Sequence, residues 1–431
     1  MNRHGMARVA VGIAAAGLAA GALAGCSGSG GDSSDGDVTL TWWHNATSGP
    51  MVQVWEEVAQ EFEDAHPGVT VEQTGYQNED LQRTLIPNAL AAGDPPDLFQ
   101  VWPGGELRDQ VANGYLMPLD DAIPDVVSSV GETASLWQVD GATYGIPFTF
   151  GVEGFWYNTD LFAQAGIAEP PTTLDELKDD VAALRAAGIT PIAVGAGDKW
   201  PAAHWWYQFL LHSCSPEVLQ ESGTSFDFGD PCFVAAGEEL QELLGIDPFQ
   251  EGFLGTPAQT GAGSSAGMIA NGQAAMELMG HWNSGVIAGL TPDQAVPPFL
   301  GWFPFPAIPG SDGDPTAALG GGDGFGCAAS APPECTELLA YIMSDEVQKK
   351  FAASGAGIPT VPAAQSSLEE PSLQAIAEAI SDASYIQLWF DTFYGTTIGN
   401  AMNEGIVNLV AGNGTPQDIV TKMTDAAATL Q

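Results

Sequence analysis

The sequence predicts an α/β protein with two lobes, and three observations support this prediction. The chain has 431 residues, 45% of them hydrophobic, which is enough to bury two cores of ordinary domain size. A strand, helix, strand, helix, strand pattern begins at residue 38, and a second helix and strand unit follows residue 147. Strands that alternate with helices are typical of open α/β sheets.

The first unit opens with an apolar, β-branched strand at 38–43 and a turn at 48–50. The next helix should bury the face formed by Met51, Trp55, Val58 and Phe62, which are spaced by 4, 3 and 4 residues. A strand at 69–73, a helix at 79–92 kinked at Pro87 and a strand at 97–102 complete the unit. Open α/β sheets bind ligands beyond the carboxyl ends of their strands, here 43–45 and 102–104.

The second unit contains a capping box from Thr173 to Glu176, which starts a helix ended by Gly188 before a strand at 189–194. The glycine-rich stretches 256–267 and 310–326 are expected to be loops and crossings between the units. The last third of the chain has helical patterns at 334–353, 372–381 and 415–430.

The charge balance excludes one class of ligand. With 54 Asp and Glu against 10 Lys and Arg, the formal net charge is -44, which repels the phosphates of nucleic acids and anionic lipids. Charged residues form only 15% of the chain, so the acidity reflects missing cations, and solubility explains it.

The N-terminus predicts export and a lipid anchor. Arg3, His4 and Arg8 precede an uncharged run at 9–24, which is too short to span a bilayer, and Leu-Ala-Gly-Cys at 23–26 has the form of a lipobox. We expect a signal peptide at 1–25, a lipid on Cys26 and a flexible tether at 26–37. The protein would then sit outside the cytoplasm on the outer face of the cell membrane; plain secretion is the alternative.

The other four cysteines form an even set in an exported chain, which predicts disulfides. Three pairings are possible, and we favour the two shortest loops, Cys214 with Cys232 and Cys327 with Cys335. A zinc site is the rival, but there is no CxxC spacing and the six His are scattered, so we expect no metal and no cofactor.

Several short segments, taken in order, resemble one family. They are ALAAGDPPD at 89–97, GYLMPLDD at 114–121, GIP at 145–147 with FWYN at 155–158, PPTTLDE at 170–176, GQAAM at 272–276 with GHW at 280–282, and SDEVQ at 344–348. Over nearly all its mature length the chain resembles the extracellular sugar-binding proteins of ABC importers, the family of maltose-binding protein. WHNATSG at 43–49 and YIQLWFD at 385–391 look most like actinobacterial oligosaccharide binders, with xylo-oligosaccharides the first expectation.

The resemblance implies the two-lobe, type II periplasmic-binding-protein fold, an α/β sheet in each lobe and a hinge beside the ligand cleft. It places 38–146 and 316–357 in the first lobe, and 147–315 and 358–431 in the second. It also implies a monomer that delivers a neutral oligosaccharide to ABC permease subunits and meets the membrane only through its lipid. The disulfides are not a general feature of the family and rest on the cysteine count alone.

A sugar site needs aromatic platforms and a few polar groups in the plane of the ring. Trp282 is the first candidate, because the family often has its platform at the matching position. The other candidate ligand contacts are Trp43, His44, Asn45, Trp102, Glu153, Trp200, Gly322, Asp323 and Trp389. His44 and Asn45 follow the first strand, Glu153 lies in an apolar run, and Asp323 lies among glycines where backbone can approach a ligand.

A lipid-anchored glycoside hydrolase is the alternative from another class, since it would also be acidic, Trp-rich and exported. It would need two carboxylates about 5 to 9.5 Å apart across a cleft. The sequence has no HExxH or Walker motif, so we expect a binding protein and not an enzyme.

Overall fold

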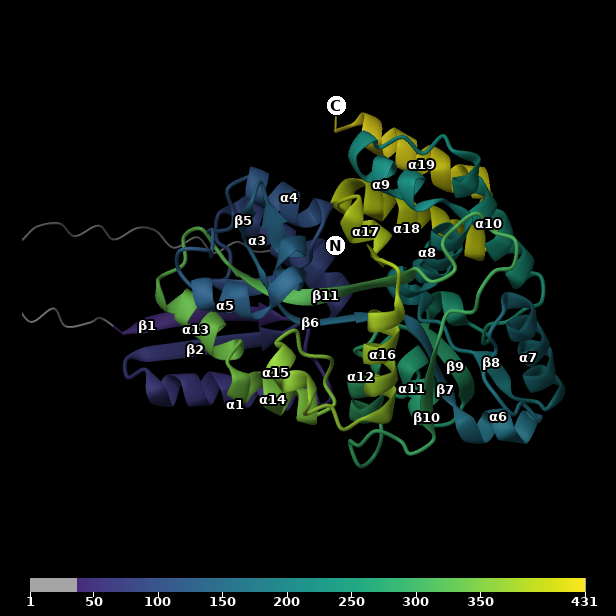
Figure 1. Ribbon diagram of the computed structural model, residues 1–431, viewed down its shortest axis with the longest axis horizontal. Helices are drawn as coiled ribbons and strands as arrows, with labels where there is room; N and C mark the ends of the chain where they lie inside the picture. Colours follow the sequence, from purple (N-terminus) through teal and green to yellow (C-terminus); the bar gives the residue numbers. More distant parts are fainter. Residues whose placement is uncertain (1–36, 431) are drawn as a thin grey trace, which may run out of the picture. The chain divides into compact units, whose positions relative to one another are not determined.

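The computed structural model describes residues 37–430, which form two large sheets and one two-stranded sheet, with helices around them (Figure 1). The predicted signal peptide, Cys26 and most of the tether lie outside these residues. We call the part built on the larger sheet the first lobe and the part built on the smaller sheet the second lobe.

The sheet of the first lobe has six strands in the order β12-β11-β3-β1-β2, with β6 also paired to β11. β1 pairs in parallel with both β2 and β3, so the chain runs outward in both directions from β1, and the carboxyl ends of β1 and β3 meet at one edge. β11 is antiparallel to β3 and β6, and β12 pairs in parallel with its start. The strands are β1 (Val38–His44), β2 (Val69–Gly75), β3 (Leu98–Val101), β6 (Ile146–Val152), β11 (Ala318–Cys327) and β12 (Ile386–Leu388).

Helix α1 (Pro50–Ala65) buries Trp55, Val58 and Phe62 of the predicted face, and Met51 is partly buried. The kink expected at Pro87 is a short π-helix, Leu81–Leu85, between α2 (Asn78–Asp80) and α3 (Ile86–Ala92). Pro87 has no N–H to donate, and the Ile86 N–H just before it bonds Leu81 O, five residues back.

The second lobe has a four-stranded sheet in the order β10-β7-β9-β8, in which only β8 and β9 are parallel. The strands are β7 (Gly154–Asn158), β8 (Thr190–Ile192), β9 (Ala274–Met279) and β10 (Leu300–Pro304). The predicted capping box is present: Thr173 accepts from the Glu176 N–H at the start of α7 (Leu174–Ala186). Its predicted inward residues, Leu174, Leu177, Val181 and Leu184, are buried.

The stretch 310–326 was expected to be loop or crossing: a loop is wrong from residue 318 onward, where the chain forms β11, but β11 is a crossing between the two cores. The glycines serve close packing: a Cβ on Gly321 would lie 2.5 Å from Trp389 Nε1, and one on Gly324 would lie 2.7 Å from Trp137 Nε1. The single helix expected at 334–353 is also two, α13 (Glu334–Ile342) and α14 (Asp345–Ala353), because Ser344 caps the second by accepting from Val347 N–H.

β11 crosses from one core to the other. Leu319 packs with the second-lobe core around α8 (Trp200–Ser213), whereas Phe325 and Cys327 pack with the first-lobe core around α1. This places Asp323 between the two cores. The exact lobe boundaries given by the sequence stay a prediction.

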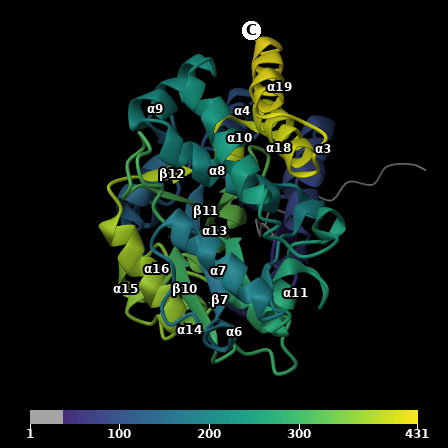
Figure 2. The ribbon, with the colours of Figure 1, turned by 90° about the vertical axis from the view of Figure 1, so that its right-hand side faces the viewer.

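In Figure 2, α9, α10, α18 and α19 of the second lobe lie at the top, α7 lies in front of the strands and α6 lies at the bottom. The other helices are α4 (Gly105–Ala112), α5 (Pro124–Ser129), α6 (Thr159–Ala165), α9 (Pro216–Ser225), α10 (Pro231–Leu244), α11 (Ser265–Ala270), α12 (Asn283–Gly289), α15 (Pro362–Gln365), α16 (Pro371–Asp382), α17 (Phe390–Phe393), α18 (Thr396–Val410) and α19 (Pro416–Ala428). β4 (Gln138–Val139) and β5 (Ala142–Thr143) pair as a separate two-stranded sheet. Short 3₁₀ segments lie at Gly131–Trp137, Ala196–Asp198 and Phe253–Gly255.

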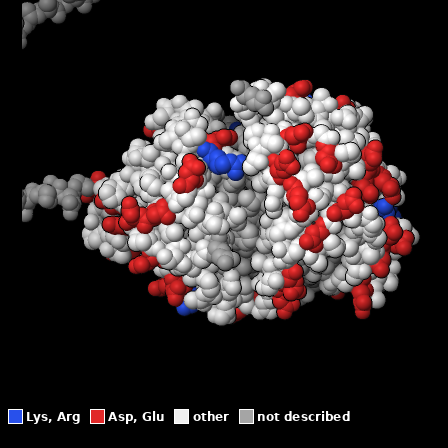
Figure 3. Space-filling view, turned by 45° about the horizontal axis from the view of Figure 1, so that its top comes forward, with Lys and Arg blue, Asp and Glu red and all other residues white. Residues whose placement is uncertain are grey.

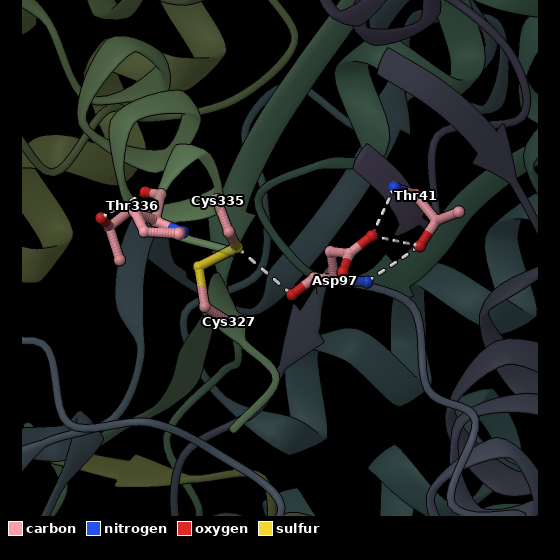
Figure 4. Close-up of a disulfide and its surroundings, with 6 residues drawn as sticks. Thr41, Asp97, Cys327, Cys335 and Thr336 are labelled. Carbon is pink, nitrogen blue, oxygen red and sulfur yellow. Dashed lines mark hydrogen bonds between the residues drawn. A yellow bond between two sulfur atoms is a disulfide. The ribbon is translucent and has the colours of Figure 1, made fainter. Parts of the chain in front are cut away.

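Both predicted disulfides are confirmed. Cys214 and Cys232 join the end of α8 to the start of α10, and Cys327 and Cys335 join β11 to α13. Beside the second bridge, Asp97 accepts from the backbone N–H and the hydroxyl of Thr41, which ties the start of β3 to β1 (Figure 4). Each disulfide therefore fastens a helix to its own lobe.

Acidic side chains are spread over the face shown in Figure 3, with few Lys or Arg among them. Among residues 37–430, no helix is both long and apolar enough to cross a membrane.

Candidate functional site

A pocket lies where the carboxyl ends of β1 and β3 face the second lobe. Its walls come from the β1–α1 loop, the residues after β3, β11, and the starts of α8, α12 and α17. It is lined by Asn45, Ala46, Thr47, Ser48, Met51, Asn78, Gln82, Trp102, Trp200, His204, Gln259, Trp282, Gly285, Val286, Gly322, Asp323, Ala356, Trp389, Asp391 and Thr392.

The structure brings most of the predicted site residues to this pocket. Those that line it are Asn45, Trp102, Trp200, Trp282, Gly322, Asp323 and Trp389. Trp43, His44 and Glu153 are not among the lining residues.

Trp43 and His44 are held by the neighbouring strand. The Trp43 ring packs on the edge of Tyr76 at 5.2 Å between centroids. His44 is buried, its Nδ1 accepts from the Ala46 N–H, and its Nε2 lies 2.5 Å from Gln73 Oε1. Burial lowers the pKa of His44 to about 4, so the ring is neutral and donates through Nε2 to Gln73.

Glu153 lies behind the pocket. Its carboxylate accepts from His204 Nδ1 and, at 2.8 Å, from Gln208 Nε2, both on α8. The His204 ring in turn stacks on Trp389, with 4.8 Å between centroids and 4° between planes. Glu153 thus acts through His204 and Trp389, both of which line the pocket.

Three tryptophans form an aromatic wall on the second-lobe side: Trp200, Trp282 and Trp389. The Trp282 ring is 6.1 Å from Trp200 and 5.7 Å from Trp389, in edge-to-face contacts. Its ring lies directly over Gly280, where a Cβ would come within 2.3 Å of it. Trp282 Nε1 is buried without a hydrogen-bond partner, so what the wall offers a ligand is its flat apolar surface.

The polar side of the pocket faces this wall. Asn45 Nδ2 donates to Asn78 Oδ1 at 3.0 Å and to Asp323 Oδ2 at 3.5 Å, while Asn45 Oδ1 is buried without a partner. The pairing of β6 with β11 shifts register between Asp323 and Gly324, an irregularity of the kind that re-aims a side chain. Burial raises the pKa of Asp323 to about 6, and the hydrogen bond from Asn45 opposes this.

No cation faces the ligand space. None of the described residues that line the pocket is Lys or Arg. The nearby guanidinium of Arg83 is engaged by Asp391 at 2.7 Å and Glu106 at 3.4 Å. An anionic ligand would lose its hydration without gaining a counter-charge, whereas hydroxyl groups could pair with the free polar atoms.

Within the described part of the chain, no three His, Cys, Asp or Glu side chains gather closely enough to hold a metal ion.

Sequence reasoning missed several lining residues, above all His204, Asp391, Asn78 and Gln259. His204 could have been found, because it follows Trp200 by four residues and therefore shares its face of α8. Asn78 and Gln259 lie on segments whose folding toward the pocket is set by distant contacts.

A family model described as bacterial extracellular solute-binding protein matches residues 46–349. A protein of Brucella abortus (strain 2308) named as a binding protein is 32% identical over 187 residues, 42% of this chain and 44% of that relative, so the match spans less than half of its length. The diacetylchitobiose binding protein DasA of Streptomyces coelicolor is 26% identical over 356 residues, 80% of this chain and 78% of that protein. A solved structure of a chitin oligosaccharide binding protein is 26% identical with a TM-score of 0.82, and the match covers 91% of this chain and 98% of that one.

Proposed function

This chain belongs to the bacterial extracellular solute-binding proteins, and from that premise we propose that it captures a neutral oligosaccharide for an ABC importer. Its fold is the two-lobe α/β fold of type II periplasmic binding proteins, as the sequence predicted. The ligand would lie in the pocket between the lobes, which close around it.

The observation that most supports this function is the composition of the pocket. The aromatic wall presents surfaces on which the C–H faces of a sugar ring can stack. Asn45, Asp323 and Asp391 line the pocket and carry groups that can hydrogen-bond the hydroxyls of a sugar. The absence of a cation among the lining residues favours an uncharged sugar.

Two kinds of oligosaccharide are candidates. The segments at 43–49 and 385–391 favour xylo-oligosaccharides. The names of two of the similar proteins, which bind diacetylchitobiose and chitin oligosaccharide, favour chito-oligosaccharides. We retain xylo-oligosaccharides as the first candidate and test both.

We further propose that the protein is a monomeric lipoprotein held by Cys26 to the outer face of the cell membrane, where it meets the permease subunits. A Cys26→Ala protein should be released from the membrane or kept as precursor. Labelling with a radioactive fatty acid should mark the wild type and not this variant.

A thermal-shift screen over neutral mono- and oligosaccharides, with a uronic acid as charged control, tests the function. A sugar at 100 times its Kd should add about 2.7 kcal/mol of stability. Chromatography of the sugar after incubation separates the hydrolase alternative: a binding protein returns it intact, and a hydrolase yields shorter products. Failure of every neutral sugar to raise the melting temperature would refute the proposal.

A further inference from the structure

Cations are rare in this protein, and an unusual share of them join the two lobes. Arg3 and Arg8 precede the described residues, which leaves eight of the ten Lys and Arg. Three of these eight contact the other lobe at one edge of the pocket: Arg83 with Asp391, Arg108 with Phe393 O at 3.2 Å, and Lys199 with Glu79 at 3.7 Å.

Arg83 differs from the other two because it is buried. Its side chain is 7% exposed, as is that of Asp391, and the two atoms Nη2 and Oδ2 are 2.7 Å apart. Glu106 of α4, in the first lobe, holds the other guanidinium nitrogen at 3.4 Å and also accepts from Gln82 at 2.9 Å. The guanidinium is therefore positioned from the first lobe and points to a carboxylate of the second.

Asp391 is both a partner of Arg83 and part of the pocket wall. It belongs to α17, whose Phe390 packs in the second-lobe core, and it also accepts from Asn403 Nδ2 at 3.2 Å. Without Arg83, a buried carboxylate in this position would lack a counter-charge, which is costly.

Glycines allow the two lobes to meet at this edge. Gly104 and Gly105 begin α4 against the backbone at 392–395, and a Cβ on Gly105 would lie 2.5 Å from Gly395 N. This close approach brings α17 within reach of Arg83, which lies on the neighbouring π-helix. The ion pair and the contact between the backbones form together when the lobes close.

We propose that Arg83 is a positioning residue for ligand capture: by pairing with Asp391 across the lobes it both fastens the closed cleft and fixes an acceptor of the ligand site. The inference rests on the proposed function, since it describes the capture of that ligand. Closure would then complete the site, and release of ligand would require this buried pair to separate.

A double-mutant cycle tests the proposal, with Arg83→Met, Asp391→Asn and the double variant. The ligand is the sugar that most stabilises the wild type, and the readouts are its Kd, its dissociation rate by stopped-flow tryptophan fluorescence, and the melting temperature without sugar. Each single variant should weaken binding about tenfold or more through faster dissociation, and the double variant should bind no more weakly than the worse single one. Arg83→Lys keeps the positive charge but not the planar guanidinium with its two donor nitrogens, so it should bind sugar more tightly than Arg83→Met but less tightly than the wild type.

Arg185→Met is the matched control, because Arg185 pairs with the exposed Asp247 within the second lobe and is not a pocket residue. It should leave the dissociation rate unchanged. Additive losses in the cycle, or coupling that shows only in the melting temperature without sugar, would overturn the proposal.

If the wild type binds no sugar, the proposed function fails, and the ion pair is then tested by small-angle scattering of the ligand-free protein. Arg83→Met should enlarge the radius of gyration by favouring open forms. An unchanged radius in that case would also overturn the role of Arg83.

Discussion

Trp282 stands at the middle of the aromatic wall, in contact with Trp200 on one side and Trp389 on the other. It is only partly buried, and its indole N–H has no partner. What fits it to stack on a ligand is its place among the residues that line the pocket. Trp302, on β10, is also partly buried but is not a lining residue, so it offers a comparison of similar size.

We expect Trp282→Ala to weaken sugar binding about tenfold or more, equal to about 1.4 kcal/mol, because a stacking surface is lost. The melting temperature without sugar should change little. Titration by tryptophan fluorescence and a thermal melt measure the two effects. Trp302→Ala should lower the melting temperature and leave sugar binding nearly unchanged. A Trp282→Ala protein that binds sugar normally but melts much lower would place Trp282 in the core.

Glu277 is a second residue with a measurable consequence. It is fully buried on β9, accepts from Asn283 Nδ2 at 2.8 Å through Oε2, and has no partner at Oε1. Burial raises the pKa of Glu277 to about 7. The folded protein therefore holds this proton more tightly than the unfolded chain, and stability falls as pH rises from about 4.5 to 7.

Glu277→Gln should remove this pH-dependent loss of stability, so the variant should gain free energy of unfolding of the order of 3 kcal/mol at pH 8 and little at pH 5. Urea unfolding at both pH values measures it. Asp323 and Glu106 also have raised pKa values, but they change the stability of the wild type and of the Glu277 variant by the same amount and so do not affect the comparison. Glu369→Gln, at an exposed position, serves as the control. If the free energy of unfolding of the Glu277 variant changed between pH 5 and pH 8 as much as that of the wild type, this role of Glu277 would be refuted.

At the scale of elements, α12 meets the β1–α1 loop through glycines. A Cβ on Gly289 would lie 2.4 Å from Gly49 N, and one on Gly49 would lie 2.2 Å from Gly285 O. These residues belong to different lobes and flank the pocket. If the lobes open, as the proposed function requires, this contact would be lost.

Gly289→Ala should act as a wedge between the lobes. We expect sugar affinity to fall about tenfold, while stability without sugar stays equal or rises, since Ala favours a helix over Gly by about 1 kcal/mol. Calorimetric titration and a thermal melt give both values. Gly255→Ala is the control, because nothing lies within 4 Å of its added Cβ; equal affinities for the two variants would exclude a closing contact at Gly289.

The disulfides fasten elements within a lobe and should matter for stability alone. Replacing Cys214 and Cys232 with Ala should lower the free energy of unfolding by about 3 kcal/mol, and replacing Cys327 and Cys335 slightly less, because the second loop is shorter. Chemical unfolding measures both. A change in sugar affinity without a change in stability would contradict this assignment.

The elements that the sequence predicted well are those with local signals. The capping box at Thr173 and the apolar face of α1 depend on neighbours within a few residues, and both are confirmed. β11 could not be predicted, because its glycines are explained by Trp137 and Trp389, which lie more than 60 residues away along the chain. A glycine-rich strand and a glycine-rich loop look alike until those rings are in place.

Dependence on distant residues also limited how much of the site could be predicted from the sequence. Asn45 and Trp102 follow strand ends, so the rule for open α/β sheets places them correctly at the pocket. Glu153 was expected to contact the ligand because it lies in an apolar run, but the fold pairs it with His204 and leaves it outside the pocket lining. Asp391 takes its role from Arg83, 308 residues earlier, and no local pattern could reveal that pair.

At the scale of the whole molecule, the acidic surface and the pocket differ in composition. Acidic side chains are spread over the face shown in Figure 3, whereas the pocket joins aromatic rings to a few polar groups and contains no Lys or Arg among its described lining residues. Sugar binding should therefore change little between low and high salt. Under the proposed function, the strength of binding would come from two lobes that contribute opposite walls of the pocket.

The most direct test of this account is a crystal structure of the protein with the oligosaccharide that stabilises it most. We predict a sugar ring stacked on Trp282, with hydroxyls within hydrogen-bond distance of Asn45 and Asp323 and the Arg83–Asp391 pair formed behind it. A sugar bound elsewhere on the protein, or bound here with Trp282 and Asp323 untouched, would contradict the account.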